Sequence, residues 1–254
     1  MLWRQTEALI LGHTELGEAD RIITLISPEY GKLKGAVRGS RNPKSRMCAS
    51  TQPLTHAQVI FREKKNTDLH RISQCDIITP FTNLRGDLER LAGGLYIAEL
   101  AAALTPMGEE NRPLFQLLLW ALNRLEAGAG VDKTLRIWEV RLLSLLGYGP
   151  ELGVCVGCGK PVGAGGASLV PARGGLLCGG CLSQNGSGVP LSLGSLNFLR
   201  RALDLDIEKL GRLNLTQSSQ HELKTAMRRY LTYQVNYDLH TYRFLDLLGG
   251  GPAA

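Results

Sequence analysis

Four cysteines in two closely spaced pairs are the residues of this chain best suited to chemistry. Two residues separate Cys155 from Cys158 and Cys178 from Cys181, and 19 residues lie between the pairs. Each C-x2-C turn can present two thiolates to one tetrahedral ion, and four sulfur ligands suit Zn2+. Because four thiolates leave no coordination position for water or substrate, the pattern predicts one structural Zn2+ ion. Two reduced pairs, or a redox-active pair, are the alternative interpretation.

The segment between the two pairs is rich in glycine and has little apolar content with which to order itself. A metal cross-link would fix such a segment, so we expect the ion to hold residues 151–183 in place. The other two cysteines, Cys48 and Cys75, stand alone in the sequence. We expect them to be small thiols, buried or partly buried.

The second chemical feature is a run of positive charge that no acid interrupts. Residues 30–62 contain seven lysines and arginines and no aspartate or glutamate, and extension to residue 65 adds two lysines and one glutamate. A surface of one sign repels itself, which makes sense if a nucleic-acid backbone supplies the opposite charge. A solvated basic face without a partner is the alternative. The predicted nucleic-acid contacts are Tyr30, Lys32, Lys34, Arg38, Arg41, Lys44, Arg46, Arg62, Lys64 and Lys65.

Two aromatic residues at the ends of this stretch, Tyr30 and Phe61, are candidates for stacking on bases. Aromatic faces stack on any base, while Lys and Arg contact phosphates without reading the sequence. Core packing is the alternative role for both residues, and for Phe61 it is the preferred interpretation.

The length and charge of the chain fit these two features. Its 254 residues are enough for two modest domains or one domain with an insertion, and its net charge is +6. Residues 1–80 hold 12 bases and 8 acids, so positive charge is concentrated near the N-terminus. The N-terminus lacks the long apolar region of a signal peptide, and the apolar run at residues 114–122 is too short to span a bilayer. We therefore expect a cytoplasmic protein with reduced thiols and no membrane partner.

Hydrophobic spacing predicts the elements that position these residues. Five apolar, β-branched segments separated by turn residues predict strands, and a five-stranded oligonucleotide-binding (OB) barrel fits that number. From Asn83 onward, leucines and alanines recur every three or four residues, as in helices with one buried side. The predicted strands are residues 3–13, 20–27, 31–39, 56–63 and 69–78, and the predicted helices begin near residues 83, 111, 131, 195 and 219.

These elements predict an α+β protein with two domains. Residues 1–80 would form the OB barrel that binds nucleic acid, and residues 81–254 a helical domain that carries the zinc segment. Gly93 and Gly94 weaken the first long helix, so we expect close packing there. Ser219 and Glu222 have the spacing of a capping box at the start of the last long helix.

Motifs for common enzyme chemistries are missing from the sequence. The chain has no G-x-x-x-x-G-K-[ST] phosphate loop, no H-E-x-x-H and no G-x-S-x-G. Asp204, Asp206 and Glu208 could in principle hold Mg2+ in a nuclease. At a spacing of two on a helix end they do not share a face, so a solvated acidic surface is the better interpretation. We therefore expect a protein that is not an enzyme.

Several longer motifs follow one another in an order typical of one family. They are GEADRIITLISPEYGKL (17–33), VRGSRNPKSR (37–46), VIFR (59–62), YIAEL (96–100), WEVRLLSLLGYGP (138–150) followed by CVGCG, and GGLLCGGC (174–181). In order and spacing the chain resembles the RecO family of bacterial recombination mediators and DNA repair proteins. The resemblance covers nearly the whole chain up to about residue 203.

The resemblance implies an N-terminal OB fold and a helical domain that carries the zinc segment. It also implies binding of single- and double-stranded DNA, annealing of complementary strands without ATP, and cooperation with RecR. In that role the protein would help RecA to load onto DNA coated with single-stranded-DNA-binding protein (SSB). The acidic, hydrophobic C-terminal tail of SSB is then an expected partner, and the nucleoid an expected location. The basic OB face of the family is carried over by charge onto Lys32, Lys34, Arg38, Arg41, Lys44 and Arg46.

A function of another class stays open, namely an RNA-binding or ribosome-associated OB/zinc module. Charge and an OB barrel do not separate RNA from DNA, because discrimination would come from contacts to the 2′-hydroxyl. A metal-dependent nuclease is a third hypothesis, which incubation with Mg2+ and labelled DNA would test.

Overall fold

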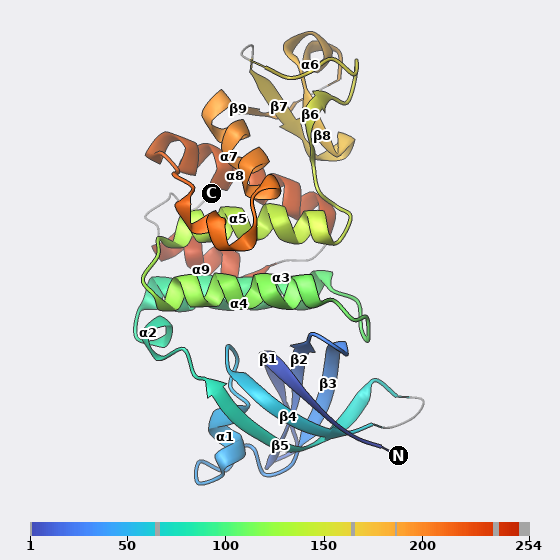
Figure 1. Ribbon diagram of the computed structural model, residues 1–254, viewed down its shortest axis with the longest axis vertical. Helices are drawn as coiled ribbons and strands as arrows, with labels where there is room; N and C mark the ends of the chain where they lie inside the picture. The colour runs from blue at the N-terminus through green and yellow to red at the C-terminus, as the bar shows by residue number, and fades with distance from the viewer. Residues whose placement is uncertain (1, 64–66, 164–165, 186, 236–238, 249–254) are drawn as a thin grey trace. The chain divides into compact units, whose positions relative to one another are not determined.

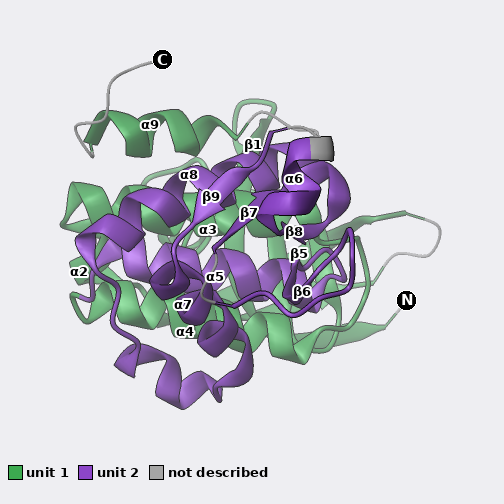
Figure 2. Ribbon diagram, turned by 90° about the horizontal axis from the view of Figure 1, so that it is seen from above, with its two compact units in different colours: residues 1–128, 239–254 green, residues 129–238 purple. Residues whose placement is uncertain are grey.

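The computed structural model describes residues 2–63, 67–163, 166–185, 187–235 and 239–248 (Figure 1). By their contacts the residues divide into two compact units (Figure 2). The barrel unit is Met1–Gly128 with Leu239–Ala254, and the cysteine unit is Ala129–Asp238. The predicted boundary at residue 80 lies directly after the last barrel strand. By contacts, the three helices that follow and the C-terminal helix group with the barrel.

Five strands of the barrel unit close into a barrel in the order β1-β2-β3-β5-β4, which confirms the predicted OB-type fold. Neighbouring strands are antiparallel except β3 and β5, which are parallel. The first strand pairs with β4 and then with β2, and its register shifts between Ile10 and Gly12. Such a bulge bends the strand, which helps β1 to pair with a neighbour along each of its edges and so to close the barrel. The elements are β1 (Trp3–Leu16), β2 (Asp20–Ser27), β3 (Gly31–Val37), α1 (Arg46–Ser50), β4 (His56–Arg62) and β5 (Leu69–Thr79).

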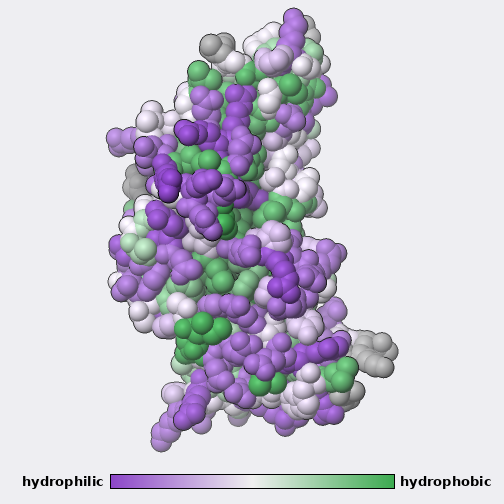
Figure 3. Space-filling model, in the orientation of Figure 1, coloured by the Kyte–Doolittle hydropathy of each residue, from purple (hydrophilic) through white to green (hydrophobic). Residues whose placement is uncertain are grey.

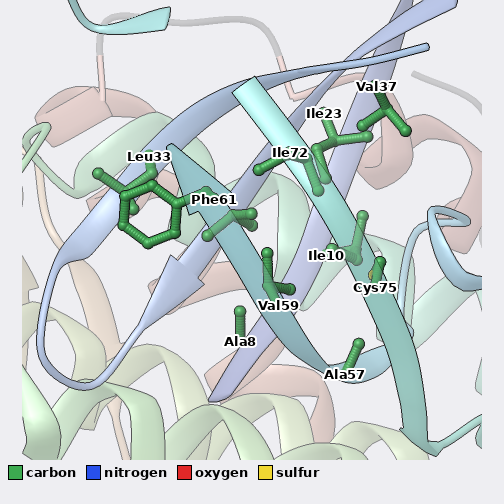
Figure 4. Close-up of a cluster of buried hydrophobic side chains, with 11 residues drawn as sticks. Ala8, Ile10, Ile23, Leu33, Val37, Ala57, Val59, Phe61, Ile72 and Cys75 are labelled. Carbon is green, nitrogen blue, oxygen red and sulfur yellow. The ribbon is translucent and has the colours of Figure 1, made fainter. Parts of the chain in front are cut away.

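Alternation along each strand determines which side chains fill the barrel. Eleven buried residues form its core, among them Ile10, Ile23, Val59 and Phe61 (Figure 4). Full burial of a side chain of this size contributes roughly 1.5–3 kcal/mol. Cys75 is part of this core, and burial raises the pKa of its thiol to about 11. The barrel therefore has an apolar interior that is independent of the charged residues on its outside.

Four helices complete the barrel unit: α2 (Thr82–Arg85), α3 (Leu88–Leu104), α4 (Arg112–Glu126) and α9 (His240–Leu248). The predicted close packing is seen at Gly94, where a Cβ would lie 2.9 Å from the Leu54 side chain. Asn111 caps α4 by accepting a hydrogen bond from the N–H of Leu114. At α9, the Glu99 carboxylate of α3 accepts hydrogen bonds from the backbone N–H groups of His240 and Thr241. Capping of this kind satisfies N–H groups that have no partner within the helix.

The cysteine unit combines long helices with a small sheet of order β6-β8-β7-β9. The helices are α5 (Val131–Leu145), α7 (Leu193–Asp204) and α8 (Gln217–Val235). The sheet and its connections are β6 (Glu151–Cys155), β7 (Ala167–Val170), η1 (Pro171–Arg173), β8 (Gly175–Leu177), α6 (Gly179–Asn185) and β9 (Val189–Leu191), and η2 (Ile207–Arg212) precedes α8. Arg200 of α7 donates hydrogen bonds to the carbonyls of Leu152 and Val162, which joins the sheet to the helices.

The capping box predicted from Ser219 and Glu222 is wrong. Thr216 caps α8 instead, because its hydroxyl accepts a hydrogen bond from the N–H of Ser219. The Glu222 carboxylate is used at the start of α7, where it accepts hydrogen bonds from the N–H of Ser192 and the hydroxyl of Ser195. Spacing along one helix does not show that a neighbouring helix offers better donors.

No helical segment among the described residues combines the length and the apolar character that a bilayer crossing requires. On the face shown in Figure 3, hydrophilic residues cover most of the surface over the barrel, and hydrophobic residues form separate patches.

Candidate functional site

The parallel pairing of β6 with β8 brings the two cysteine pairs together. Cys155 is the last residue of β6, and it pairs with Leu176, two residues before Cys178. Cys158 lies in the turn after β6, and Cys181 lies in α6. The Sγ atoms of all four cysteines lie within 4.8 Å of one another. In the described part of the chain, this is the one group of three or more side chains found close enough to share a metal ion.

The backbone around the cysteines lets their sulfurs converge. The N–H of Gly159 donates to the carbonyl of Cys155 at 2.8 Å, and the N–H of Cys178 donates to the Cys155 Sγ at 3.4 Å. Gly157 packs so close to Cys181 that a Cβ would lie 3.1 Å from its Sγ. The sulfurs of Cys158 and Cys178 are 3.9 Å apart, well beyond a disulfide bond of about 2.05 Å, so they are thiols.

The four thiols cannot all ionise without a cation between them. Hydrogen bonds, first of all from the backbone N–H of Cys178, lower the pKa of Cys155 to about 6. The pKa of Cys181 is raised to about 12, mainly by hydrogen bonds with the sulfurs of Cys158, Cys178 and Cys155. One thiolate therefore forms easily and suppresses ionisation of its neighbour. A cation at the centre would allow neighbouring thiols to ionise together. The cluster therefore fits a metal site with four sulfur ligands.

The basic residues predicted to contact nucleic acid lie on the barrel and fall into two groups. The loop group follows β3 and reaches into α1; it consists of Arg38, Arg41, Lys44 and Arg46. Arg38, Lys44 and Arg46 are exposed, and no carboxylate of the described residues forms an ion pair with them. These three positive charges are available to a ligand.

Arg41 differs from the rest of the loop group because it holds the loop in place. Its guanidinium lies 3.3 Å from the Glu15 carboxylate and also donates to the carbonyl of Gly17. Its backbone N–H donates to the carbonyl of Ala19, and the N–H of Gly39 donates to the Asp20 carboxylate. The loop is thereby joined to the β1–β2 turn, and Arg41 contributes more to its position than to its free charge.

The strand group consists of Lys32, Lys34 and Arg62 on the outside of β3 and β4. The Lys32 Nζ donates to the carbonyl of Ala102 in α3 at 2.6 Å. Burial, and secondly the charge of Lys34, lower the pKa of Lys32. Lys34 is exposed, and Arg62 is partly exposed. Lys64 and Lys65 lie outside the described residues.

The two predicted stacking residues pack against each other. Phe61 is 2% exposed and points into the barrel core, so the core packing preferred from the sequence is confirmed (Figure 4). Tyr30 is half-buried, and its ring meets Phe61 edge to face at a centroid distance of 5.3 Å. The alternation of β4 places Phe61 inward, because Ala57 and Val59 have the same parity.

Comparisons with known proteins identify the family of the chain. Residues 1–81 match the family model "Recombination protein O N terminal", and residues 85–243 match "Recombination protein O C terminal". The chain belongs to the RecO family. It is 36% identical to the DNA repair protein RecO of Pelotomaculum thermopropionicum, over 98% of this chain and 96% of the relative. It is 34% identical to the RecO of a Roseiflexus species, over 95% of this chain and 84% of the relative.

Membership in the RecO family gives the chain a role in DNA repair and recombination. Two exposed residues outside the predicted set lie on strands next to β4, which carries Arg62. Arg71 of β5 is exposed, and no carboxylate of the described residues forms an ion pair with it. Trp3, at the start of β1, is 58% exposed. The acid-free stretch missed both residues because Glu63 and Asp68 separate it from Arg71, and Trp3 lies 27 residues before Tyr30. The pairing of strands would have been the signal, because β4 lies between β1, which carries Trp3, and β5, which carries Arg71.

The acidic residues near the end of α7 do not gather around a common point. Asp206 forms an ion pair with Lys209 at 2.6 Å, and the hydrogen bond from Lys209 lowers the pKa of Asp206. Among the described residues, Asp204, Asp206 and Glu208 are not found as a metal-binding group. The geometry fits the solvated acidic surface expected from the sequence.

Proposed function

We propose that this RecO-family chain is a DNA-binding recombination mediator that anneals complementary single strands without ATP. The observation that carries the proposal is the position of Arg38, Lys44 and Arg46, which are exposed on an OB-type barrel and free of carboxylate partners within the described chain. Such side chains bind phosphates of any sequence. A mediator has to hold strands in this way before their bases meet.

The proposed mechanism is charge neutralisation on a fixed surface. Annealing requires two polyanions to approach, and phosphate contacts lower their mutual repulsion while counterions are released. The loop group is held in place by Arg41, so its three free cations need little reorganisation to bind. No nucleotide hydrolysis enters these steps, which agrees with the absence of a phosphate-loop motif from the sequence. If four to six phosphates are contacted, the logarithm of affinity should fall with the logarithm of salt at a slope of about −3 to −5.

We further propose that Cys155, Cys158, Cys178 and Cys181 hold one Zn2+ ion with a structural role. Four thiolates are a ligand set typical of structural zinc, and such an ion supplies a fixed tetrahedral geometry rather than chemistry on DNA. The cysteines join β6, the start of α6 and the end of β8, and Arg200 extends that connection to α7. The four cysteines and Arg200 therefore brace the helices of the cysteine unit.

Family membership supports RecR, RecA loading and the C-terminal tail of SSB as parts of the same proposal. The mediator would act in the cytoplasm at the nucleoid, on single-stranded DNA that SSB covers. The direct experiment is annealing of complementary SSB-coated oligonucleotides without ATP, with and without RecR. Annealing that requires ATP, or no annealing under either condition, would contradict the proposal.

A variant that lacks the three free cations of the loop group tests the observation on which the proposal rests. Arg38, Lys44 and Arg46 changed together to Ala should abolish annealing and reduce the salt slope by about 3, one for each lost phosphate contact. The thermal midpoint should stay nearly unchanged because these side chains are exposed. Arg41 is left intact so that the loop keeps its position.

The matched control removes the same charge from the cysteine unit. Arg201, Arg212 and Arg229 are exposed residues of α7, η2 and α8. Their change to Ala should leave annealing and the salt slope as in the wild type. Equal losses in both triple variants would mean that net charge matters and that the loop group is not the binding surface.

A further inference from the structure

A row of outward-facing side chains crosses the barrel and begins at Trp3. The strand register pairs Trp3 with Arg62, Arg62 with Arg71, and Arg71 with Ala36. Phe61 and Ile72, the chain neighbours of Arg62 and Arg71, belong to the core, so the two arginines point outward. Lys34 lies two residues before Ala36 and therefore on the same side of β3. We call Trp3, Arg62, Arg71 and Lys34 the tryptophan row.

Trp3 has the surroundings of a stacking platform. The Arg62 guanidinium lies over its ring at 6.0 Å from the centroid, and the residue is still 58% exposed. A cation over an indole ring is attracted to it and steadies its orientation. The barrel thus presents a large aromatic surface to solvent, held by a residue that is itself suited to phosphate binding.

The charges around the row favour an anionic chain. Arg71 and Lys34 are exposed and, like Arg62, have no ion pair with a described carboxylate. Glu63, which follows Arg62, is occupied by Arg4 at 3.3 Å. Asp68, next to the start of β5, is exposed and is one negative charge at the margin of the row. The row thus combines one aromatic platform, which Arg62 contacts, with further cations on the next strands, and this combination suits the bases and phosphates of a single strand.

We propose that Trp3 stacks on an unpaired base of single-stranded DNA while Arg62, Arg71 and Lys34 hold the flanking phosphates. This inference rests on the proposed function and adds strand-type preference to it. In a duplex both faces of each base are covered by neighbouring bases, so Trp3 has no surface to stack on. The loop group contacts phosphates alone and treats single and double strands alike, whereas the tryptophan row selects the single strand.

The test compares two ligands that share a phosphate chain and differ in their bases. The wild type should bind a thymidine oligonucleotide more tightly than an abasic oligonucleotide of equal length. Trp3→Ala should lose about 5- to 140-fold in affinity for the thymidine strand, the range typical of stacking on one base. Its affinity for the abasic strand and for duplex DNA, and its salt slope, should not change. Trp3→Tyr should restore most of the loss, because a tyrosine ring also stacks.

A matched control removes a different exposed apolar side chain of the barrel. Ile78 of β5 is 48% exposed, and Ile78→Ala should leave all three affinities unchanged. The inference is overturned if Trp3→Ala binds the thymidine strand as the wild type does. It is also overturned if this variant loses affinity for the abasic strand to the same extent.

The same titrations separate this inference from the function on which it rests. If the proposed function fails, the wild type itself shows no salt-dependent binding to any of the three ligands, and both ideas fall. If the tryptophan row alone is wrong, the wild type binds with a steep salt slope but does not distinguish thymidine from abasic strands.

Discussion

The barrel and the cysteine-bearing sheet are ordered by different interactions. The barrel has strands of 7 to 14 residues around a core of eleven buried side chains. The sheet of the cysteine unit has strands of only 3 to 5 residues, and Cys155 and Cys178 sit at the ends of β6 and β8. Strands this short have few ladder hydrogen bonds, although they bury apolar side chains such as Leu169, Leu176 and Leu177.

This difference explains where each region places its reactive groups. The barrel folds around apolar residues, so its outer cations do not have to take part in folding and are available to DNA. The cysteine-bearing sheet brings four sulfurs together at the ends of its strands and in the adjoining turn and helix, so under the proposal above its metal chemistry contributes to folding. Binding and metal chemistry are therefore expected to be separable by mutation.

The largest expected effect is the loss of one sulfur ligand. Cys178→Ser should lower the stability of the cysteine unit by several kcal/mol, because the binding free energy of a structural zinc ion is on the order of 10 kcal/mol and is coupled to folding. Metal content by mass spectrometry should fall from one ion per chain to nearly none. DNA binding by the barrel should persist at temperatures where the cysteine unit is already cut by protease.

Cys48→Ser is the control for this prediction. Cys48 is a partly buried thiol of α1 outside the sulfur cluster, so its substitution should keep the full metal content and stability. A Cys178→Ser protein that is metal-free and yet as stable as the wild type would show that the sheet orders itself without an ion.

The next effect concerns the barrel interior. Phe61→Ala removes a fully buried ring and should lower the free energy of unfolding by about 3–5 kcal/mol, measured by urea titration. Phe61→Leu keeps most of the volume and should cost much less. At a temperature where both variants are folded, both should bind thymidine and abasic strands in the wild-type ratio. A selective loss of thymidine binding in Phe61→Leu would return Phe61 to a role in stacking.

The barrel could be predicted from the sequence because its pattern is local and long. Alternation over seven or more residues shows both the strand and its inward side, as in Leu33 and Val37 against Lys32 and Lys34. The four strands between residues 151 and 191 escaped prediction because three to five residues are too few for a period to be recognised. The spacing of the four cysteines nevertheless predicted the sulfur cluster that these strands hold.

Residue roles that depend on distant partners could not be predicted. The acid-free stretch included Arg41 and Lys32, but their partners Glu15 and Ala102 lie elsewhere in the sequence. The C-terminal helix α9 packs on α3, where Tyr242 meets Tyr96 edge to face at 5.2 Å. Contacts of this kind over about 140 residues follow from the fold and leave no sign in local sequence.

The smallest expected effect tests whether polar capping also stabilises the cysteine unit. Burial alone would raise the pKa of Glu222, but hydrogen bonds from Ser195 and Ser192 outweigh it, so the pKa is lowered. A carboxyl with a lowered pKa in the folded state stabilises the protein above its unfolded pKa of about 4.3, and this contribution is lost as the pH falls through the folded value. Glu222→Gln should therefore cost about 1 kcal/mol at pH 7, and the gap to the wild type should close near pH 3.

Urea unfolding of Glu222→Gln at pH 7 and pH 3 measures this gap directly, and Glu208→Gln is its control because Glu208 is exposed on η2. A gap that stays constant with pH would mean that the substitution acts through shape and not through the charge of the cap.

If the gap closes as expected, helix α7 is fixed by contacts at three places. The Glu222 charge acts at its start and Arg200 in its middle. At its end, the Arg141 guanidinium donates to the carbonyls of Ala202 and Leu203. Charged side chains would then add to the apolar packing of α7, which buries Leu196, Phe198 and Leu199, whereas the barrel strands are held by apolar packing.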